Sequence, residues 1–151
     1  MSSPSRRLRE RPRPNPPDAA PGPNVVDSSA WLEYFADEPN AAHFAPAIEA
    51  VARLVVPSIT LYEVYKRLDT DRGRAYAQRG AAQMLQGHVI DLDAHVALTA
   101  AQTSRAERLP MADSIILATT RLNHATLWTQ DDHFKNMAGV RYFPKAVTRH
   151  R

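Results

Sequence analysis

Short apolar segments alternate with helix-forming segments along most of the chain, and this alternation constrains the fold more than any other feature. Short apolar strands are predicted at 24–27, 54–57, 88–92 and 126–129, of which 54–57 is expected to be buried, with a weaker fifth strand at 140–143. Strands joined by helices run parallel, and right-handed crossovers place the connecting helices on both faces of the sheet. The pattern therefore predicts an α/β fold with a parallel sheet flanked by helices on both faces.

Capping residues and helix breakers predict where the helices begin and end. Ser28 or Ser29 is expected to cap a helix that ends before Pro39, and Ser58 is expected to cap another. Further helices are expected at 41–53, interrupted or bent near Pro46, and at 75–85, 93–109 and 111–123. A helix thus lies in every interval between the predicted strands except the last.

The first 23 residues differ in composition from the rest of the chain. They hold seven of the twelve prolines, and five arginines against two acidic residues, which accounts for the whole formal net charge of +3. Proline prevents helix and sheet hydrogen bonds, and the segment has few apolar residues to bury. We expect 1–23 to be a disordered Pro/Arg-rich tail, either inert or an arm that binds RNA through charge, followed by one domain at 24–147.

The rest of the composition excludes several classes of protein. The chain has no cysteine, which excludes disulfides, thiolate metal sites and cysteine nucleophiles. No apolar run reaches the roughly 18 residues of a membrane helix, and no apolar segment follows the basic N-terminus as in a secretory signal. We therefore expect a cytoplasmic protein that makes no contact with membranes.

Four acidic residues stand where predicted elements begin or end. Asp27 follows the first strand and Asp131 follows the fourth, so both are expected at the carboxyl edge of the sheet, where α/β folds bind ligands. Glu63 lies in the helix after the second strand, and Asp113 opens the helix before the fourth. Each acid alone also suits a helix cap, a helix dipole or a solvated surface. Their joint placement predicts that the four carboxylates converge at one edge.

Converging carboxylates repel one another unless a cation neutralises them. Oxygen ligands without cysteine or a pair of histidines favour Mg²⁺ or Mn²⁺ over Zn²⁺, and such an ion assists hydrolysis of a phosphodiester bond. Ser28, Thr129 and Asp132 flank the four acids and are candidates for supporting roles, with capping and turn formation as their alternative. His133 is also near the acids in sequence, and we expect it at the surface.

Four segments resemble, in order and spacing, the motifs of PIN-domain ribonucleases. They are 25–30 with Asp27, 58–64 with Glu63, 110–119 with Asp113 and 127–134 with Asp131, and 140–143 is similar to the closing strand of the family. Within the family the chain is most similar to VapC-type toxins of bacterial toxin–antitoxin pairs. One departure is His133, which stands where the family often has an aspartate. Either Asp131 or Asp132 then completes the site, and we favour Asp131.

The resemblance implies a PIN-like fold with a central five-stranded parallel sheet and a Mg²⁺- or Mn²⁺-dependent endoribonuclease site. The catalytic and metal-binding residues would be Asp27, Glu63, Asp113 and Asp131. It also implies a homodimer that a cognate antitoxin protein inhibits. The substrate would be RNA, in a single-stranded form that leaves its phosphates and bases accessible. A basic cluster either lines the RNA groove or is a solvated surface, and it consists of Lys66, Arg67, Arg72, Arg74 and Arg79.

Two other classes of protein stay open at this point. A receiver domain of a signalling pathway is also a parallel α/β fold, with a phosphoryl-accepting aspartate at a strand end and a lysine after the last strand. Asp27 or Asp91 would accept the phosphoryl group, and Lys145 would be that lysine. A catalytically silent PIN-like module would bind RNA or protein without cleaving it. Labelling by acetyl phosphate would support the first class, and binding that Asp113→Asn leaves unaltered would support the second.

Overall fold

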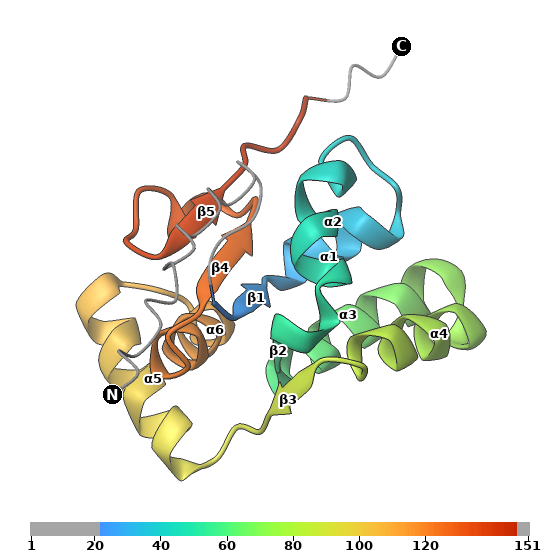
Figure 1. The fold of residues 1–151 in the computed structure, drawn as a ribbon. Helices are drawn as coiled ribbons and strands as arrows, with labels where there is room; N and C mark the ends of the chain where they lie inside the picture. Colours follow the sequence, from blue (N-terminus) through green and yellow to red (C-terminus); the bar gives the residue numbers. More distant parts are fainter. Residues whose placement is uncertain (1–21, 148–151) are drawn as a thin grey trace, which may run out of the picture.

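A computed structural model describes residues 22–147 and shows one five-stranded sheet (Figure 1). The strands are β1 (Asn24–Val26), β2 (Leu54–Pro57), β3 (His88–Ile90), β4 (Thr126–Thr129) and β5 (Val140–Tyr142). Their order is β3-β2-β1-β4-β5, and every neighbouring pair is parallel. The predicted strands and the α/β fold class are confirmed. The prediction of a disordered tail falls, apart from residues 22 and 23, outside the described residues.

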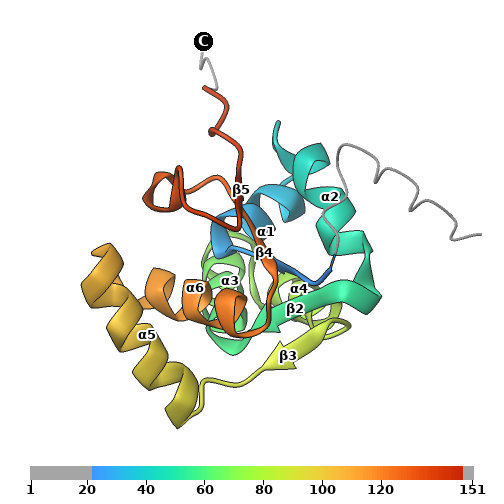
Figure 2. The same ribbon diagram turned by 60° about the vertical axis from the view of Figure 1, so that its left-hand side comes forward.

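Within the described residues, six α-helices connect the strands and cover both faces of the sheet (Figure 2). They are α1 (Ser28–Phe35), α2 (Ala41–Glu49), α3 (Ser58–Arg72), α4 (Arg74–Met84), α5 (Ala94–Glu107) and α6 (Met111–Leu122). The helix predicted at 41–53 ends at Glu49 and is followed by the short 3₁₀ helix η1 (Val51–Arg53), and α2 is not interrupted at Pro46. A second 3₁₀ helix, η2 (Asp132–Phe134), follows β4. None of the described helices combines the length and the apolar character that a membrane span requires.

Side chains alternate along each strand and so create a core on each face of the sheet. The core on one face joins the strands to the first four helices and includes Val26, Trp31, Phe44, Val56, Met84 and Trp128. The core on the other face joins them to α6 and includes Val25, Val55, Ile116, Leu117 and Leu127. Because both faces are covered, the central strands β1, β2 and β4 are mostly apolar rather than alternating, while the edge strands β3 and β5 are only partly buried.

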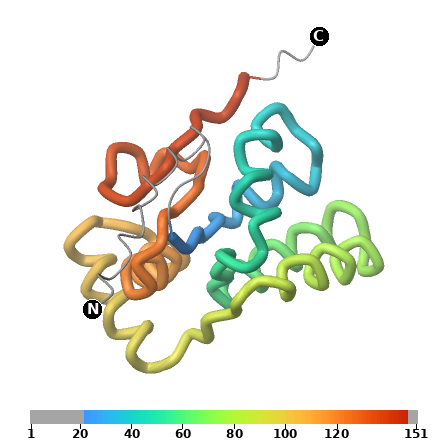
Figure 3. The backbone as a smooth tube through the Cα atoms, viewed as in Figure 1, coloured from blue at the N-terminus to red at the C-terminus, as the bar shows by residue number. Residues whose placement is uncertain are grey.

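Strand β1 lies in the middle of the sheet, with the β2–β3 half on one side and the β4–β5 half on the other (Figure 3). The winding of the chain reverses here, and the carboxyl ends of β1 and β4 flank the crevice in which such folds bind ligands. Receiver domains have the strand order 2-1-3-4-5, whereas this sheet has the order 3-2-1-4-5. The receiver-like alternative is therefore wrong.

Two of the predicted helix caps are also wrong. Ser28 and Ser58 are the first residues of α1 and α3, and Ser29 lies inside α1. The Ser28 hydroxyl donates a 2.7 Å hydrogen bond to Oε1 of Glu63, and the Ser58 hydroxyl accepts a 3.1 Å bond from the backbone N–H of Leu92. Both serines thus bind groups more than thirty residues away, which the local capping pattern does not reveal.

Candidate metal centre

Asp27 directly follows β1 and is almost completely buried, with 2% of its surface exposed. Its Oδ2 accepts hydrogen bonds from the hydroxyls of Ser29 at 2.7 Å and of Thr129 at 2.9 Å. Burial raises the pKa of this carboxyl to about 6, while the two hydroxyl donors lower it and the charge of Asp131 raises it. A negative charge on Asp27 is therefore costly unless a cation lies close by.

Glu63 is in the second turn of α3 and is partly buried. Its Oε1 accepts the hydrogen bond from Ser28, which joins α3 to the start of α1 directly after Asp27. Thr129, at the end of β4, bonds Asp27 in the same manner. The two hydroxyl residues expected to support the site thus each bind one of its predicted carboxylates.

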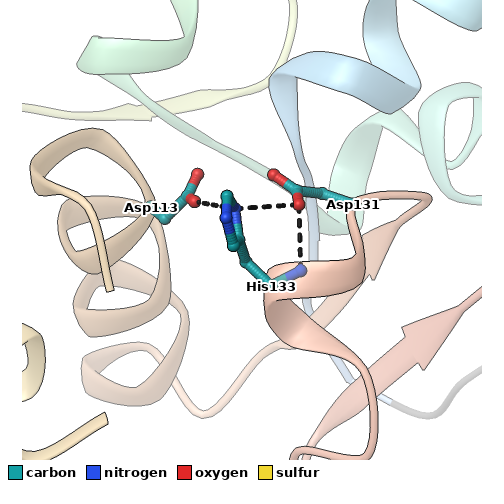
Figure 4. Close-up of side chains that lie close together, drawn as sticks. All are labelled: Asp113, Asp131 and His133. Atoms are coloured by element: carbon teal, nitrogen blue, oxygen red, sulfur yellow. Dashed lines mark hydrogen bonds and ion pairs between the residues drawn. The ribbon is translucent and has the colours of Figure 1, made fainter. Parts of the chain in front are cut away.

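Asp113 and Asp131 come from different elements and meet at one imidazole (Figure 4). Nδ1 of His133 lies 2.8 Å from Oδ2 of Asp113, in the first turn of α6, and 3.0 Å from Oδ1 of Asp131. The same Oδ1 of Asp131 accepts a 3.0 Å hydrogen bond from the backbone N–H of His133 and so caps η2. Asp131 therefore both caps a helix and faces Asp113.

The carboxylates of the site influence one another electrostatically. Burial raises the pKa of Asp113 to about 6, and the charges of Asp131, Asp27 and Glu63 raise it as well, while His133 lowers it. The pKa of His133 is raised, chiefly by the charge of Asp131 and also by that of Asp113. Asp27, Glu63 and Asp131 thus all lie near enough for their charges to act on Asp113, and we refer to these four acids as the acidic cluster.

The residues present fit a divalent cation. Asp113, Asp131 and His133 each offer a ligand atom, and within the described residues these atoms lie within 4.8 Å of one another. Asp27 and Glu63 are not part of this group of three, but their charges act on Asp113. Carboxylate oxygens are ligands of hard divalent cations, and their mutual repulsion provides the physical reason to bind one.

His133 and Asp132, which follow Asp131 in the fourth motif, differ in their relation to the site. His133 is 57% exposed, as a surface residue would be, yet it bonds both Asp113 and Asp131. Its position in the fourth motif, where an aspartate is common, was the signal that pointed to the site. Asp132 is exposed and makes no described side-chain bond, whereas Asp131 faces the cluster. The geometry therefore agrees with the preference for Asp131.

A buried polar network behind the cluster was not predicted. Glu33 of α1 is 6% exposed, and its two oxygens accept hydrogen bonds from the backbone N–H of Asn40 at 3.0 Å and from Nε2 of Gln130 at 3.2 Å. The Asn40 amide in turn donates to Oε1 of Gln130 at 3.1 Å. Gln130 lies between Thr129 and Asp131, so the network fixes the chain segment that carries both.

A five-stranded parallel sheet with acidic residues at its carboxyl edge is typical of metal-dependent α/β enzymes. A comparison with protein-family models identifies which family this chain belongs to. The family model for the PIN domain matches residues 25–140, a span that includes all four predicted acids. The chain therefore belongs to the PIN domain family, and the family resemblance of its motifs is confirmed.

Solved structures of toxins from toxin–antitoxin pairs share this fold. A toxin–antitoxin complex from Klebsiella pneumoniae is 22% identical with a TM-score of 0.69, over 81% of this chain and 99% of that chain. VapC20 of Mycobacterium tuberculosis, a toxin that cleaves the sarcin–ricin loop, is 18% identical with a TM-score of 0.64, over 76% and 95%. VapBC2 of Rickettsia felis, bound to a DNA fragment from its promoter, is 14% identical with a TM-score of 0.62, over 80% and 97%. No curated protein matches the chain in a sequence search.

Proposed function

We propose that this chain is a metal-dependent endoribonuclease and the toxin of a toxin–antitoxin pair. The observation that carries the proposal is the meeting of Asp113, Asp131 and His133 beside the buried Asp27, at the carboxyl edge of β1 and β4. Membership of the PIN domain family and the likeness to VapC20, which cleaves the sarcin–ricin loop, support RNA as the substrate.

The proposed catalytic residues are Asp27, Glu63, Asp113 and Asp131, and the same four would hold Mg²⁺ or Mn²⁺. When bound, such a cation activates water and stabilises the negative charge that develops on a phosphate. The cluster has only carboxylates and one exposed imidazole, which is a donor set for hard cations rather than for Zn²⁺.

The remaining polar groups orient these carboxylates. Thr129 and Ser29 donate to Asp27, and Ser28 donates to Glu63, so the three hydroxyl protons point at carboxylate oxygens. These bonds hold the carboxylate oxygens in place. In the proposed reaction the attacking group is a water that the cation would activate. Without a cation, Nδ1 of His133 bridges Asp113 and Asp131 and compensates part of their charge when protonated, a role that a bound cation would take over.

The proposal extends to partners and location. The structural relatives include complexes of a toxin with its antitoxin, two of them bound to DNA. By analogy, we propose a cognate antitoxin protein as inhibitor, a homodimer as the working form, and the cytoplasm as the location. The functional domain would be 24–147, with 1–23 as a tail outside it.

An RNA cleavage assay tests the proposal directly. Wild type and Asp113→Asn are incubated with total RNA in Mg²⁺ or in EDTA, and the new RNA ends are sequenced. We expect defined ends with wild type in Mg²⁺ only. Defined ends with Asp113→Asn at the wild-type rate, or none with wild type under any divalent cation, would refute the assignment. The second result, together with RNA binding that Asp113→Asn leaves unaltered, would favour a silent PIN-like binding module.

A further inference from the structure

A hollow of about 470 Å³ opens directly beside the acidic cluster, between α1 and α3. Its lining residues are Ser28, Leu32, Tyr62, Glu63, Lys66, Arg67 and Thr70. Ser28 and Glu63 belong to the site described above, so the hollow is continuous with it. A substrate bound at the carboxylates could therefore extend into this hollow.

Tyr62 is an exposed aromatic residue in its wall. It directly precedes Glu63 in α3, and 61% of its surface is exposed. Tyr62 and Lys66 line the hollow beside the acids and also a second, apolar hollow on their other side. We call these two residues the ridge between the hollows, and the largely exposed Tyr62 side chain lines both.

Lys66 gives this ridge a positive charge one helical turn beyond Tyr62. Its Nζ lies 5.7 Å from the centre of the Tyr62 ring, and it forms no ion pair with any described residue. The neighbouring Arg67 differs, because its Nε is paired with Asp71 at 2.9 Å. Of these two cations, Lys66 is the one free to bind an external anion.

We propose that Tyr62 and Lys66 bind the nucleotide next to the scissile phosphate, with the Tyr62 ring stacked on an unpaired base and the Lys66 ammonium on a phosphate. The inference rests on the proposed ribonuclease function and adds a binding site that favours single-stranded RNA. Stacking on an aromatic ring tolerates any base, because every base has a π face. Tyr62 would therefore select for an unpaired base but not for a particular base.

The surroundings of the ridge favour RNA over a protein segment at the hollow beside the acids. The surface of this hollow is largely apolar, but most of its lining residues carry a polar or charged group, and it joins an aromatic face and an ammonium without an ion pair in the described part of the chain to a candidate cation site. A protein segment would suit the second hollow better, which Leu61, Tyr65, Ala81 and Leu85 make apolar. An exposed aromatic ring beside a cation is the combination found in grooves for single-stranded nucleic acids.

Binding of a short unstructured RNA in EDTA tests the proposal without cleavage. We expect Tyr62→Ala to weaken binding about 5- to 100-fold, Tyr62→Phe to bind like wild type, and a fully paired RNA to be insensitive to either change. Lys66→Gln should make the plot of log K against log salt shallower by about 0.7, since it removes one phosphate contact, while Tyr62→Ala leaves that slope unchanged. The melting temperatures of all variants should match wild type, because both side chains are exposed.

Matched controls come from α5, which carries the exposed Leu98 and Arg105. Leu98→Ala and Arg105→Gln remove an exposed apolar group and a cation, and both should bind RNA like wild type. Unchanged affinity of Tyr62→Ala for single-stranded RNA, or a Tyr62→Phe variant as weak as Tyr62→Ala, would overturn the proposal. In that case wild-type RNA cleavage would still uphold the ribonuclease. Conversely, Tyr62-dependent RNA binding without any cleavage would uphold the ridge and refute the ribonuclease.

Discussion

The hydroxyl of Thr129 donates a 2.9 Å hydrogen bond to Oδ2 of Asp27, and it accepts another of 2.9 Å from the backbone N–H of Asp131. A single oxygen thus ties the end of β1 to the residue that leaves β4. Because Thr129 is fully buried, neither bond competes with bulk water. The relative position of two predicted metal ligands therefore depends on one side chain.

Thr129→Val should weaken metal binding about 10- to 100-fold, because valine keeps the shape of threonine and removes both hydrogen bonds. The loss also leaves the buried Asp27 with one donor fewer, at a cost of about 1–3 kcal/mol in the free energy of unfolding. Calorimetric titration with Mn²⁺ and urea unfolding measure the two effects.

Thr119→Val is the matched control for this prediction. Thr119 is also buried, but its hydroxyl bonds only the backbone oxygen of Ile115 within α6. This variant should lose stability and keep the metal affinity of wild type. If Thr129→Val and Thr119→Val bound Mn²⁺ equally well, the hydroxyl of Thr129 would have no role in the site.

Asp113→Asn should reduce RNA cleavage by more than about 100-fold. Removing a group that only orients a metal ligand costs about 10- to 100-fold in affinity or activity, and removing the ligand itself should cost more. The metal-free variant should also melt at a higher temperature than wild type near neutral pH, because a charge repelled by three other carboxylates is removed. Asp132→Asn serves as the control, because Asp132 is exposed and outside the cluster. A thermal shift assay in EDTA and a cleavage time course measure both effects. Wild-type activity in Asp113→Asn would contradict the assignment.

The metal-free protein should lose stability as the pH rises from about 4 to about 6. Asp27 and Asp113 each have a pKa of about 6 in the fold, against an ordinary pKa of 3.8. Over this interval the folded state binds more protons than the unfolded state, so the free energy of unfolding falls with rising pH. A divalent cation offsets the repulsion, and the increase in Tm on adding Mg²⁺ should therefore be larger at pH 7 than at pH 5.

Other groups titrate in the same range, so this pH prediction is checked by difference. Thermal melts of wild type and Asp27→Asn are recorded in EDTA from pH 4 to pH 7. The stability of Asp27→Asn relative to wild type should increase with pH, because only wild type develops the buried charge. A constant difference between the two proteins across this range would show that the pKa of Asp27 is not raised in the fold.

The three central strands β1, β2 and β4 could be predicted from sequence because they are largely buried and mostly apolar, whereas the edge strands β3 and β5 are only partly buried. Leu54–Pro57 and Thr126–Thr129 coincide with their predicted ranges, and the other strands end one or two residues early. The serines at the starts of α1 and α3 were less predictable. Capping patterns are local, whereas the hydroxyls of Ser28 and Ser58 bind partners 35 and 34 residues away.

In the candidate site, too, the features set by strand positions could be predicted, whereas contacts between distant side chains could not. Asp27 and Asp131 could be placed at one edge from their positions after parallel strands. The imidazole of His133 could not be placed between Asp113 and Asp131, since η2 turns it toward α6 and no spacing encodes that turn. Glu33 was missed because a polar residue in a helix is ordinarily exposed.

Glu33→Gln should destabilise the protein by about 1–3 kcal/mol, although the two side chains have nearly the same shape. Both oxygens of Glu33 accept hydrogen bonds, one from the backbone N–H of Asn40 and one from Nε2 of Gln130. In the glutamine variant an NH₂ group would replace one of these oxygens and face one of the two N–H donors, so that hydrogen bond would be lost. Glu49→Gln, at an exposed position of α2, should leave the free energy of unfolding unchanged. Urea unfolding compares the two variants. Equal stability of Glu33→Gln and wild type would mean that the network does not hold the segment that carries Asp131.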